Sequence, residues 1–249
     1  MLALVTGATA GFGAAIARRL VRDGRRVVGA ARRAERLEAL QAELGEAFLP
    51  FPLDVTDAAS VAALPGSLPD GWREVDALVN NAGLALGIGP AQEASLDDWE
   101  RMVATNVTAV MRMTHALLPS MVARDRGHVV NVGSVAGTFP YPGGNVYGAT
   151  KAFVAQFTRS LKSDLLGTRV RATLVEPGLV GGTEFSEVRF GGDASRAAKV
   201  YEGAAPLTAD DIAETVAWVI GLPPNVNVNR VEVMPLGQAP AALTIKRSG

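Results

Sequence analysis

The sequence has no cysteine and very few histidines, tyrosines and lysines. Its 249 residues include two histidines, three tyrosines and four lysines. The lack of cysteine excludes disulfides, thiolate metal sites and a cysteine nucleophile. With only His115 and His128 available, a histidine-rich metal centre is excluded too. We therefore expect no metal cofactor.

Strong net charge and long hydrophobic runs are missing as well. The formal net charge of −1 gives no general reason to expect nucleic acid or an anionic membrane as a partner. No apolar run approaches the length of a membrane span. The first residues, MLALVTG, show no basic region typical of a signal peptide. We therefore expect a cytoplasmic protein that binds neither nucleic acid nor membrane.

Short apolar runs alternate with longer amphipathic stretches along the chain. We expect strands at 2–6, 26–31, 48–55, 76–80, 128–134, 169–177 and 230–235, and helices at 14–24, 33–45, about 96–124, around Tyr147, and near 209–220. This alternation predicts one Rossmann-type α/β domain over 1–249, a doubly wound parallel sheet of about seven strands with helices on both faces. The Gly-rich and polar stretch at about 178–205 lacks strand periodicity and is expected to form a small substrate lid.

A glycine-rich turn, TGATAGFG, follows the first expected strand and contains Gly7, Gly11 and Gly13. Glycines allow backbone N–H groups to approach a pyrophosphate closely, and the following helix N-terminus adds partial positive charge. The alternative is a turn that only needs tight packing. The position after the first strand favours a dinucleotide site, and the absence of the P-loop lysine disfavours a nucleoside triphosphatase.

The end of the second expected strand reads AARR, with Arg32 and Arg33 and no acidic residue. In an NAD site a carboxylate at this place usually binds the ribose 2′-hydroxyl, whereas a 2′-phosphate requires arginine. Arginine binds phosphate in bidentate fashion. The sequence therefore predicts NADP(H) as cofactor, the alternative being two arginines that simply open a solvated helix.

Tyr147 and Lys151 are four residues apart in an expected helix, so they share a face. A nearby ammonium favours the phenolate and lowers the pKa of a tyrosine, which suits acid–base catalysis near neutral pH. Ser134, at the end of a neighbouring strand, is placed to hydrogen-bond the reacting oxygen. We therefore predict proton exchange between Tyr147 and a hydroxyl or carbonyl substrate, the alternative being coincidence on an ordinary amphipathic helix.

With these motifs in view, the chain resembles the short-chain dehydrogenase/reductase family over essentially its whole length. The matching stretches are TGATAGFG, LDV (53–55), NNAG (80–83), TNV (105–107), VGS (132–134), YGATK (147–151) and EPG (176–178). The resemblance implies that Tyr147 is the proton donor or acceptor, that Lys151 lowers its pKa and binds the nicotinamide ribose, and that Ser134 orients the substrate. It also implies that Asn106 helps to hold a proton relay. The expected cofactor-binding residues are Gly7, Thr9, Ala10, Gly11, Phe12, Gly13, Arg32, Arg33, Asp54, Val55, Asn81, Ala82, Gly83, Tyr147, Lys151, Pro177, Gly178, Val180 and Thr183.

Taken without the family, single members of this set have structural alternatives. Asn80 and Asn81 could be loop caps, and Asn106 could be a structural polar group in the middle of a helix. The resemblance also implies a homotetramer, and the tail AALTIKRSG is a candidate contact with a neighbouring subunit.

The substrate is less constrained than the cofactor. Three stretches, NVYGATKAF, EPGLVGGTEFSEVRF and VNVNRVEVMP, resemble the NADP-dependent serine/3-hydroxy acid dehydrogenase subgroup. That resemblance implies oxidation of serine, allo-threonine or related 3-hydroxy acids, or reduction of malonic semialdehyde. Arg189, in the expected lid, is a candidate ligand for a small anionic substrate. The alternative is a surface arginine paired with Glu184 or Glu187.

Other functions remain open at this stage. Sulfoacetaldehyde reductases are similar in sequence, and enzymes of the same type act on sugars, steroids or acyl-carrier thioesters. A protein that senses NADP without catalysis is a further alternative, because fold alone does not fix function. Such proteins typically lose the tyrosine or the lysine, and both are present here.

Overall fold

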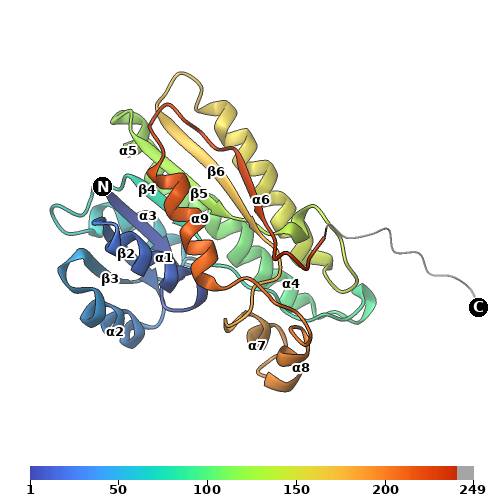
Figure 1. The fold of residues 1–249 in the computed structure, drawn as a ribbon. Helices are drawn as coiled ribbons and strands as arrows, with labels where there is room; N and C mark the ends of the chain where they lie inside the picture. The colour runs from blue at the N-terminus through green and yellow to red at the C-terminus, as the bar shows by residue number, and fades with distance from the viewer. Residues whose placement is uncertain (240–249) are drawn as a thin grey trace, which may run out of the picture.

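A computed structural model describes residues 1–239. Its centre is a seven-stranded parallel sheet with the order β3-β2-β1-β4-β5-β6-β7 (Figure 1). The strands are β1 (Leu2–Thr6), β2 (Arg26–Ala31), β3 (Phe48–Pro52), β4 (Ala77–Asn80), β5 (Gly127–Val132), β6 (Val170–Pro177) and β7 (Arg230–Val233). The predicted doubly wound α/β fold is confirmed. The candidate tail AALTIKRSG lies outside the described residues.

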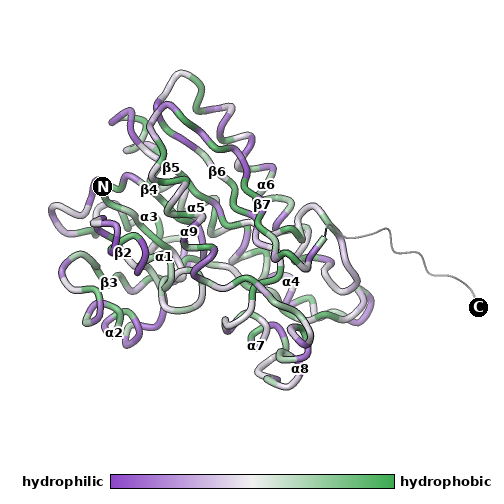
Figure 2. Tube along the Cα trace, in the orientation of Figure 1, coloured by the Kyte–Doolittle hydropathy of each residue, from purple (hydrophilic) through white to green (hydrophobic). Residues whose placement is uncertain are grey.

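Helices cover both faces of the sheet. They are α1 (Gly11–Arg22), α2 (Ala34–Leu44), α3 (Ala58–Ser67), α4 (Leu96–Val103), α5 (Ala109–Ala123), α6 (Asn145–Asp164), α7 (Phe185–Arg189), α8 (Ala194–Lys199) and α9 (Ala209–Gly221). Helices α1, α2 and α9 pack their apolar residues on one face, and α3, α5 and α6 pack on the other. Each face therefore has its own hydrophobic core, and Figure 2 shows the hydrophobic segments running through the sheet between the helices.

The central strands are apolar because both of their faces are covered. Every residue of β1 and β5 is buried, as expected for parallel strands between two helical layers. Strand order reverses beside β1, where β2 lies on one side and β4 on the other. A crevice forms at such a reversal, beyond the carboxyl ends of the strands. The topology therefore places the turns after β1, β2 and β4 together.

Three parts of the chain differ from the sequence-based expectation. Helix α3 was not anticipated, and its interior proline, Pro65, weakens the helical pattern. The single helix expected at about 96–124 is interrupted by a π-helical turn, Ala104–Thr108. The segment 178–205, called the lid segment below, contains the short helices α7 and α8. A π-helical turn replaces i→i+4 bonding by i→i+5 bonding over a single turn, which is too short a stretch for sequence periodicity to reveal.

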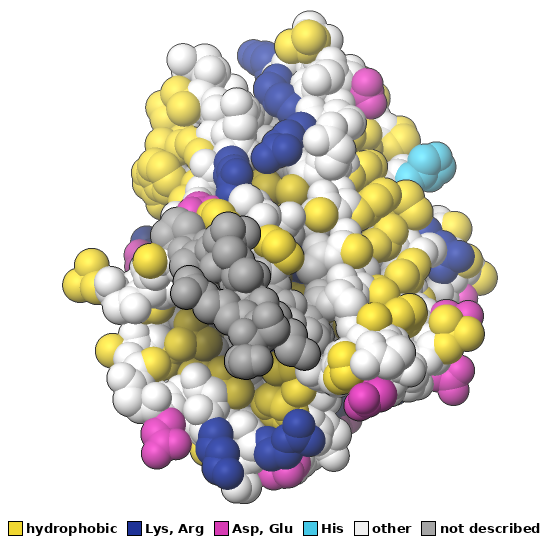
Figure 3. Space-filling view, turned by 90° about the vertical axis from the view of Figure 1, so that its right-hand side faces the viewer, with side chains coloured by type: hydrophobic (Ala, Val, Ile, Leu, Met, Phe, Trp, Pro, Cys, Tyr) yellow, Lys and Arg dark blue, Asp and Glu magenta, His cyan; other side chains and the backbone are white. Residues whose placement is uncertain are grey.

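The surface carries hydrophobic side chains on more than one element. Figure 3 shows many of them spread across one face of the molecule. The exposed large hydrophobic residues within 1–239 include Met111, Val122, Leu166 and Trp218. No helix among the described residues is both long and apolar enough to cross a bilayer.

Candidate active site

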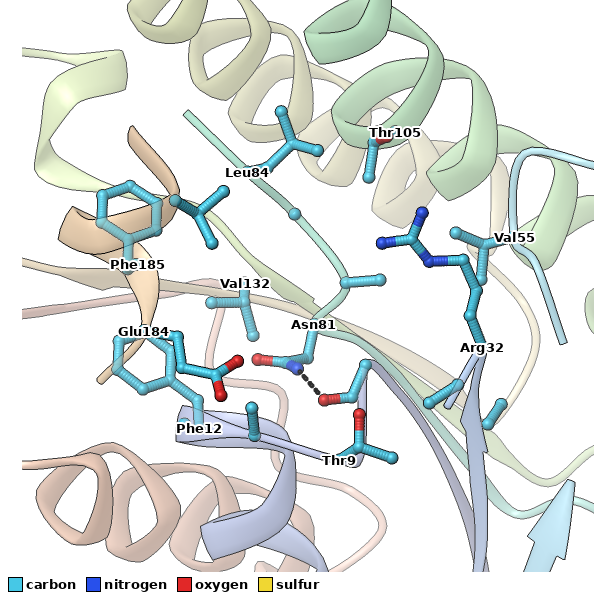
Figure 4. A pocket seen from close by; sticks show the side chains of 18 of the residues that line it. Thr9, Phe12, Arg32, Val55, Asn81, Leu84, Thr105, Val132, Glu184 and Phe185 are labelled. Carbon is cyan, nitrogen blue, oxygen red and sulfur yellow. Dashed lines mark hydrogen bonds between the residues drawn. The ribbon is translucent and has the colours of Figure 1, made fainter. Parts of the chain in front are cut away.

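A cleft of about 360 Å³ lies beyond the carboxyl ends of β1, β2, β4 and β5. One end is lined by Arg32 and Arg33, and the other by Tyr147 and Lys151. Figure 4 shows residues from the glycine-rich turn, β2, β5 and the lid segment projecting into this space. Segments that are far apart in sequence thus form one continuous cavity.

The glycine-rich turn forms the floor of the cleft. Gly7 has a φ of +67° and Gly11 has a φ of +48°, so both adopt the left-handed conformation that glycine tolerates. A Cβ on Gly13 would clash with the Gly7 carbonyl oxygen and the Asn81 amide, so this glycine lets α1 pack closely under the turn. Helix α1 begins at Gly11, and its first backbone N–H groups are available to an anion. The turn therefore fits a pyrophosphate.

The loop after β4 is locked onto this floor. The Asn81 amide nitrogen donates to the Thr6 carbonyl oxygen at 2.8 Å, and the Thr6 hydroxyl accepts from the backbone nitrogens of Asn81 and Ala82 at 3.0 and 2.9 Å. Asn80, one residue earlier, faces the core and donates to Asn131 and Thr114. These two asparagines hold the cleft wall in place, Asn80 through buried hydrogen bonds and Asn81 through partly buried ones.

The arginine end of the cleft is lined by two guanidinium groups, of Arg32 and Arg33, and by two carboxylates, of Asp54 and Glu184. Arg32 points into the cleft near Val55 (Figure 4). Asp54 accepts hydrogen bonds from the backbone nitrogen and hydroxyl of Thr56 at 2.9 and 2.7 Å. The pKa of Asp54 is lowered: burial opposes this, but the bonds from Thr56 and the charge of Arg32 outweigh it. Two positively charged side chains, Arg32 and Arg33, thus line the place where a 2′-phosphate is expected.

The reaction end is formed by α6 and the turn after β5. Tyr147 and Lys151 are 8% and 6% exposed, and the Lys151 Nζ lies 5.8 Å from the centre of the Tyr147 ring. The Lys151 ammonium donates to the Val132 carbonyl oxygen at 2.9 Å. Ser134 caps the turn after β5, where its hydroxyl accepts from the Ala136 nitrogen. The three side chains named for catalysis therefore converge, with Lys151 beneath Tyr147.

The pKa of Tyr147 differs from the sequence-based expectation. We expected the Lys151 ammonium to lower it, but burial raises the pKa of Tyr147 to about 12, against a smaller lowering by its hydrogen bond with Ser134. Burial also lowers the pKa of Lys151 to about 8. The predicted lowering of the Tyr147 pKa is thus wrong, because burial of the phenol outweighs the hydrogen bond with Ser134 and the positive charge of Arg189. Tyr147 is set up as a protonated phenol, the form that donates.

Asn106 lies in the π-helical turn and is buried. Its side chain accepts from the Leu84 nitrogen at 2.9 Å and donates to the Leu84 carbonyl oxygen at 2.8 Å. It also donates to the Thr150 hydroxyl at 3.1 Å, on α6 between Tyr147 and Lys151. The side chain thus clamps the loop after β4 to the helix that carries Tyr147. This contact set favours the structural alternative for the side chain.

Arg189 lies at the end of α7 in the lid segment. Its guanidinium carbon is 5.3 Å from the centre of the Tyr141 ring and 5.9 Å from that of Tyr147. Its Nε donates to the Gly87 carbonyl oxygen at 3.1 Å, and its Nη2 is buried without a hydrogen-bond partner among the described residues. Glu184 pairs with Arg33 and Arg36 instead, so the expected alternative pairing of Arg189 with Glu184 is wrong.

Most of the residues expected to bind cofactor line the cleft. Those are Gly7, Thr9, Ala10, Gly11, Phe12, Arg32, Arg33, Asp54, Val55, Asn81, Ala82, Gly83, Tyr147, Lys151 and Thr183. Four others do not line it: Gly13 packs beneath it, while Pro177, Gly178 and Val180 form the stem of the lid segment. Residues that the sequence did not suggest also line it: Leu84, Thr105, Glu184, Phe185 and Val188. Of these, only Leu84 lies outside the stretches already quoted for the resemblance.

The chain is similar to a known protein family and to individual proteins of that kind. The family described as short chain dehydrogenase matches residues 1–191. A protein of Salmonella typhi named NADP-dependent 3-hydroxy acid dehydrogenase YdfG is 57% identical over 248 residues, covering 100% of both chains. A serine 3-dehydrogenase of Agrobacterium fabrum is 51% identical and covers 98% of this chain and 97% of its own.

A solved structure gives the same answer at the level of the backbone. The structure described as the closed form of serine dehydrogenase complexed with NADP+ is 53% identical. It covers 100% of both chains with a TM-score of 0.98. The sequence match, the shared backbone and the Tyr147–Lys151 arrangement in the cleft lead to one conclusion. The chain belongs to the short-chain dehydrogenase family.

Proposed function

We propose that this protein is an NADP-dependent oxidoreductase that transfers a hydride between NADP(H) and the hydroxyl-bearing carbon of a small 3-hydroxy acid. The candidate substrates are serine, allo-threonine and 3-hydroxypropionate, with malonic semialdehyde in the reductive direction. The observation that carries the proposal is a single cleft that joins the Arg32–Arg33 end to the Tyr147–Lys151 end. Relatives at 51–57% identity carry names of this activity.

The cofactor is held by groups along the whole cleft. The glycine-rich turn and the N-terminus of α1 fit the pyrophosphate, because the turn presents backbone N–H groups without Cβ atoms in the way. Arg32 and Arg33 fit the 2′-phosphate, since no acidic side chain stands at the end of β2 to repel it. Lys151, which lines the other end of the cleft, would bind the nicotinamide ribose. One domain, residues 1–249 with its lid at about 178–205, would then carry both binding and catalysis.

The proton is handled by Tyr147. When bound, NADPH supplies a hydride to the carbonyl carbon of the substrate. Ser134 holds the carbonyl oxygen by a hydrogen bond, and the Tyr147 phenol gives that oxygen its proton. The raised pKa of Tyr147 keeps the phenol protonated at neutral pH and thus ready for reduction. In the oxidative direction the same phenolate oxygen takes the proton back.

Arg189 accounts for a substrate with an acid group. A buried guanidinium nitrogen without a partner is costly, and a carboxylate satisfies it with a charge-assisted hydrogen bond. The aromatic rings of Tyr141 and Tyr147 keep the guanidinium next to the reacting phenol. An anion bound by Arg189 would therefore lie beside the hydroxyl of Tyr147. Sugars and steroids offer no such anion, and this disfavours them as substrates.

A sulfonate satisfies the same guanidinium, so sulfoacetaldehyde reduction is the second candidate activity. Both activities can be tested by following NADPH absorbance with a panel of serine, 3-hydroxypropionate, malonic semialdehyde and sulfoacetaldehyde, using NADP(H) and NAD(H) in parallel. We expect turnover with at least one of the acids and a strong preference for NADP(H). Turnover with sulfoacetaldehyde alone would select the second activity. Failure of all of them would contradict the substrate class.

We further propose a homotetramer in the cytoplasm. Exposed hydrophobic side chains, among them an apolar hollow of Leu118, Pro119 and Val122 on α5, support contacts between subunits. The location follows from the cofactor, because NADPH is maintained inside cells. Light scattering during size-exclusion chromatography will test the assembly, and a monomer at micromolar concentration would contradict it.

A further inference from the structure

Glu184 joins the lid segment to the helix that follows β2. Its Oε2 is 3.1 Å from Nη1 of Arg33, and its Oε1 is 2.6 Å from Nη1 of Arg36. Arg33 also donates to the Thr9 hydroxyl at 3.3 Å, in the glycine-rich turn. These three residues, Glu184, Arg33 and Arg36, are called the strap below. The strap connects positions that are about 150 residues apart in sequence.

The strap passes over the part of the cleft that fits the pyrophosphate. Glu184 and Arg33 both line the cleft, and Thr183, beside Glu184, approaches to 3.4 Å of a Cβ built on Gly11. Figure 4 shows the Glu184 carboxylate across the cleft from Arg32. A cofactor lying on the glycine-rich turn would therefore be enclosed. The turn would lie below it, and the strap and the lid segment would lie above it.

The charges at this end favour a 2′-phosphate. Arg32, Arg33 and Arg36 carry three positive charges, and the carboxylates of Glu184 and Asp54 offset two of them. A net positive charge remains for a phosphate that carries about −1.5 to −2 at neutral pH. Arg32 makes no ion pair with any described residue and points into the cleft. A bound 2′-phosphate can thus use Arg32 and the outer face of Arg33 while Glu184 keeps its own bonds.

We propose that the strap holds the lid segment closed over bound NADP(H) and slows release of the cofactor. Glu184 is then a positioning residue that acts on the cofactor through the lid. The proposal rests on NADP(H) being the cofactor, as set out under the proposed function. Because the strap side chains are 39–44% exposed, their attraction is screened by salt. Release should therefore quicken as the salt concentration rises.

The test is the rate at which NADPH leaves the full-length protein. Protein loaded with NADPH is mixed with excess NADP+ in a stopped-flow instrument, and the loss of bound-NADPH fluorescence gives the rate. We expect Glu184→Gln and Arg36→Gln each to raise the rate about threefold to fivefold, as befits partly exposed ion pairs. The double variant should be no faster than the faster single variant, because both substitutions break the same strap.

Arg36 makes this test decisive because it does not line the cleft. Arg36 forms its ion pair with Glu184, and the double variant separates this contact from the long-range attraction of Arg36 for the phosphate, which would make the double variant faster than either single one. Glu187→Gln, in the same lid helix, is the matched control and should leave the rate unchanged. The Glu184 side chain makes no capping hydrogen bond to α7, so its loss does not remove a helix cap.

Three other outcomes would contradict the proposal that the strap slows release of the cofactor. Unchanged rates in both single variants would refute it. A slower release in Glu184→Gln would show instead that the carboxylate competes with the 2′-phosphate for Arg33. A faster release in Glu184→Gln with no change in Arg36→Gln would place the carboxylate in direct contact with the cofactor. Failure of every protein, the unsubstituted one included, to bind NADPH would overturn the proposed function itself.

Discussion

The two walls of the cleft are built differently. The wall formed by the strand ends is held by buried contacts: Asn80 bonds to Asn131, and Lys151 to the carbonyl of Val132. The lid wall is held by partly exposed side chains, with Glu184 bonded to two arginines and Arg189 stacked on tyrosine rings. The first wall can keep fixed geometry for chemistry, whereas the second can open for exchange of cofactor and substrate.

This difference predicts where each kind of damage will appear. A change in the strand-end wall should alter the chemical step or the stability of the fold, because its groups are buried and have no alternative partners. A change in the lid wall should alter affinities and rates of exchange. The comparison would be contradicted by a substitution in the lid wall that lowers turnover, or by a substitution in the strand-end wall that weakens affinity.

The largest effect is expected for Tyr147→Phe. Removal of the phenol hydroxyl leaves the ring in place against Phe185 but removes the proton donor. We expect kcat to fall by about 10² to 10⁴, while the dissociation constant for NADPH stays within about twofold. Tyr201→Phe is the matched control, since that hydroxyl bonds to Ser186 within the lid segment and lies outside the cleft. Retained turnover in Tyr147→Phe would remove this residue from the mechanism.

The next effect is expected for Arg189→Leu, in the lid wall. Loss of a charge-assisted hydrogen bond should raise KM for acid substrates about 10- to 100-fold. A neutral alcohol of the same length should lose little, since it has no anion for Arg189 to bind. Arg196→Leu serves as control, because that guanidinium stacks on Phe190, away from the cleft. Equal losses for acid and neutral substrates would contradict the role of Arg189 in recognition.

The same contrast explains what the sequence could and could not predict. The glycine-rich turn and the Tyr147–Lys151 pair are local patterns, in which a few neighbouring residues determine the backbone and the shared face. Most of the residues predicted to bind cofactor therefore line the cleft, although strand-end residues that were not predicted, such as Ala30, Leu53 and Gly133, line it too. The contacts of the lid wall join distant residues, such as Arg189 with Gly87 and Glu184 with Arg33. No pattern along the chain pairs such residues.

Burial was the other quantity that the sequence could not supply. The spacing of Tyr147 and Lys151 correctly indicated that they lie together, but the sign of the pKa shift depends on how far water is excluded. That exclusion comes from the tertiary packing around both side chains, including Phe185 of the lid segment. The hydrogen bonds of Asn106 to Leu84 and Thr150 are a similar case. They became visible only once the loop after β4 lay against α6.

A smaller effect is expected for Gly13→Ala, which tests packing in the strand-end wall. The added Cβ would meet the Gly7 carbonyl oxygen and the Asn81 amide. We expect a loss of about 1–3 kcal/mol in the free energy of unfolding. Gly66→Ala is the matched control, since a Cβ there meets nothing within 4 Å and helix α3 should gain about 0.5–1 kcal/mol. Equal stability changes in the two variants would show that the turn is not tightly packed.

The smallest change in the stability of the fold is expected for Lys151→Met. Burial lowers the pKa of Lys151 from 10.5 to about 8, so below pH 8 the folded protein carries a desolvated ammonium. A methionine removes that cost and also the bond to Val132. We therefore expect the variant to be more stable at pH 7 by about 1–2 kcal/mol, although inactive.

The pH dependence of the free energy of unfolding tests whether Lys151 destabilises the folded protein. Between about pH 8 and 10.5 the unfolded chain holds a proton on Lys151 that the folded chain has lost, so the stability of the unsubstituted protein rises with pH in that window. The variant lacks this rise, and its advantage should shrink above pH 8 and vanish near pH 10.5. Urea unfolding at pH 7, 9 and 10.5 measures it, with Lys162→Met on the same helix as control. A variant less stable than the parent at pH 7 would mean that the bond to Val132 outweighs desolvation. In that case the lysine would stabilise the strand-end wall, and its chemistry would carry no cost to the fold.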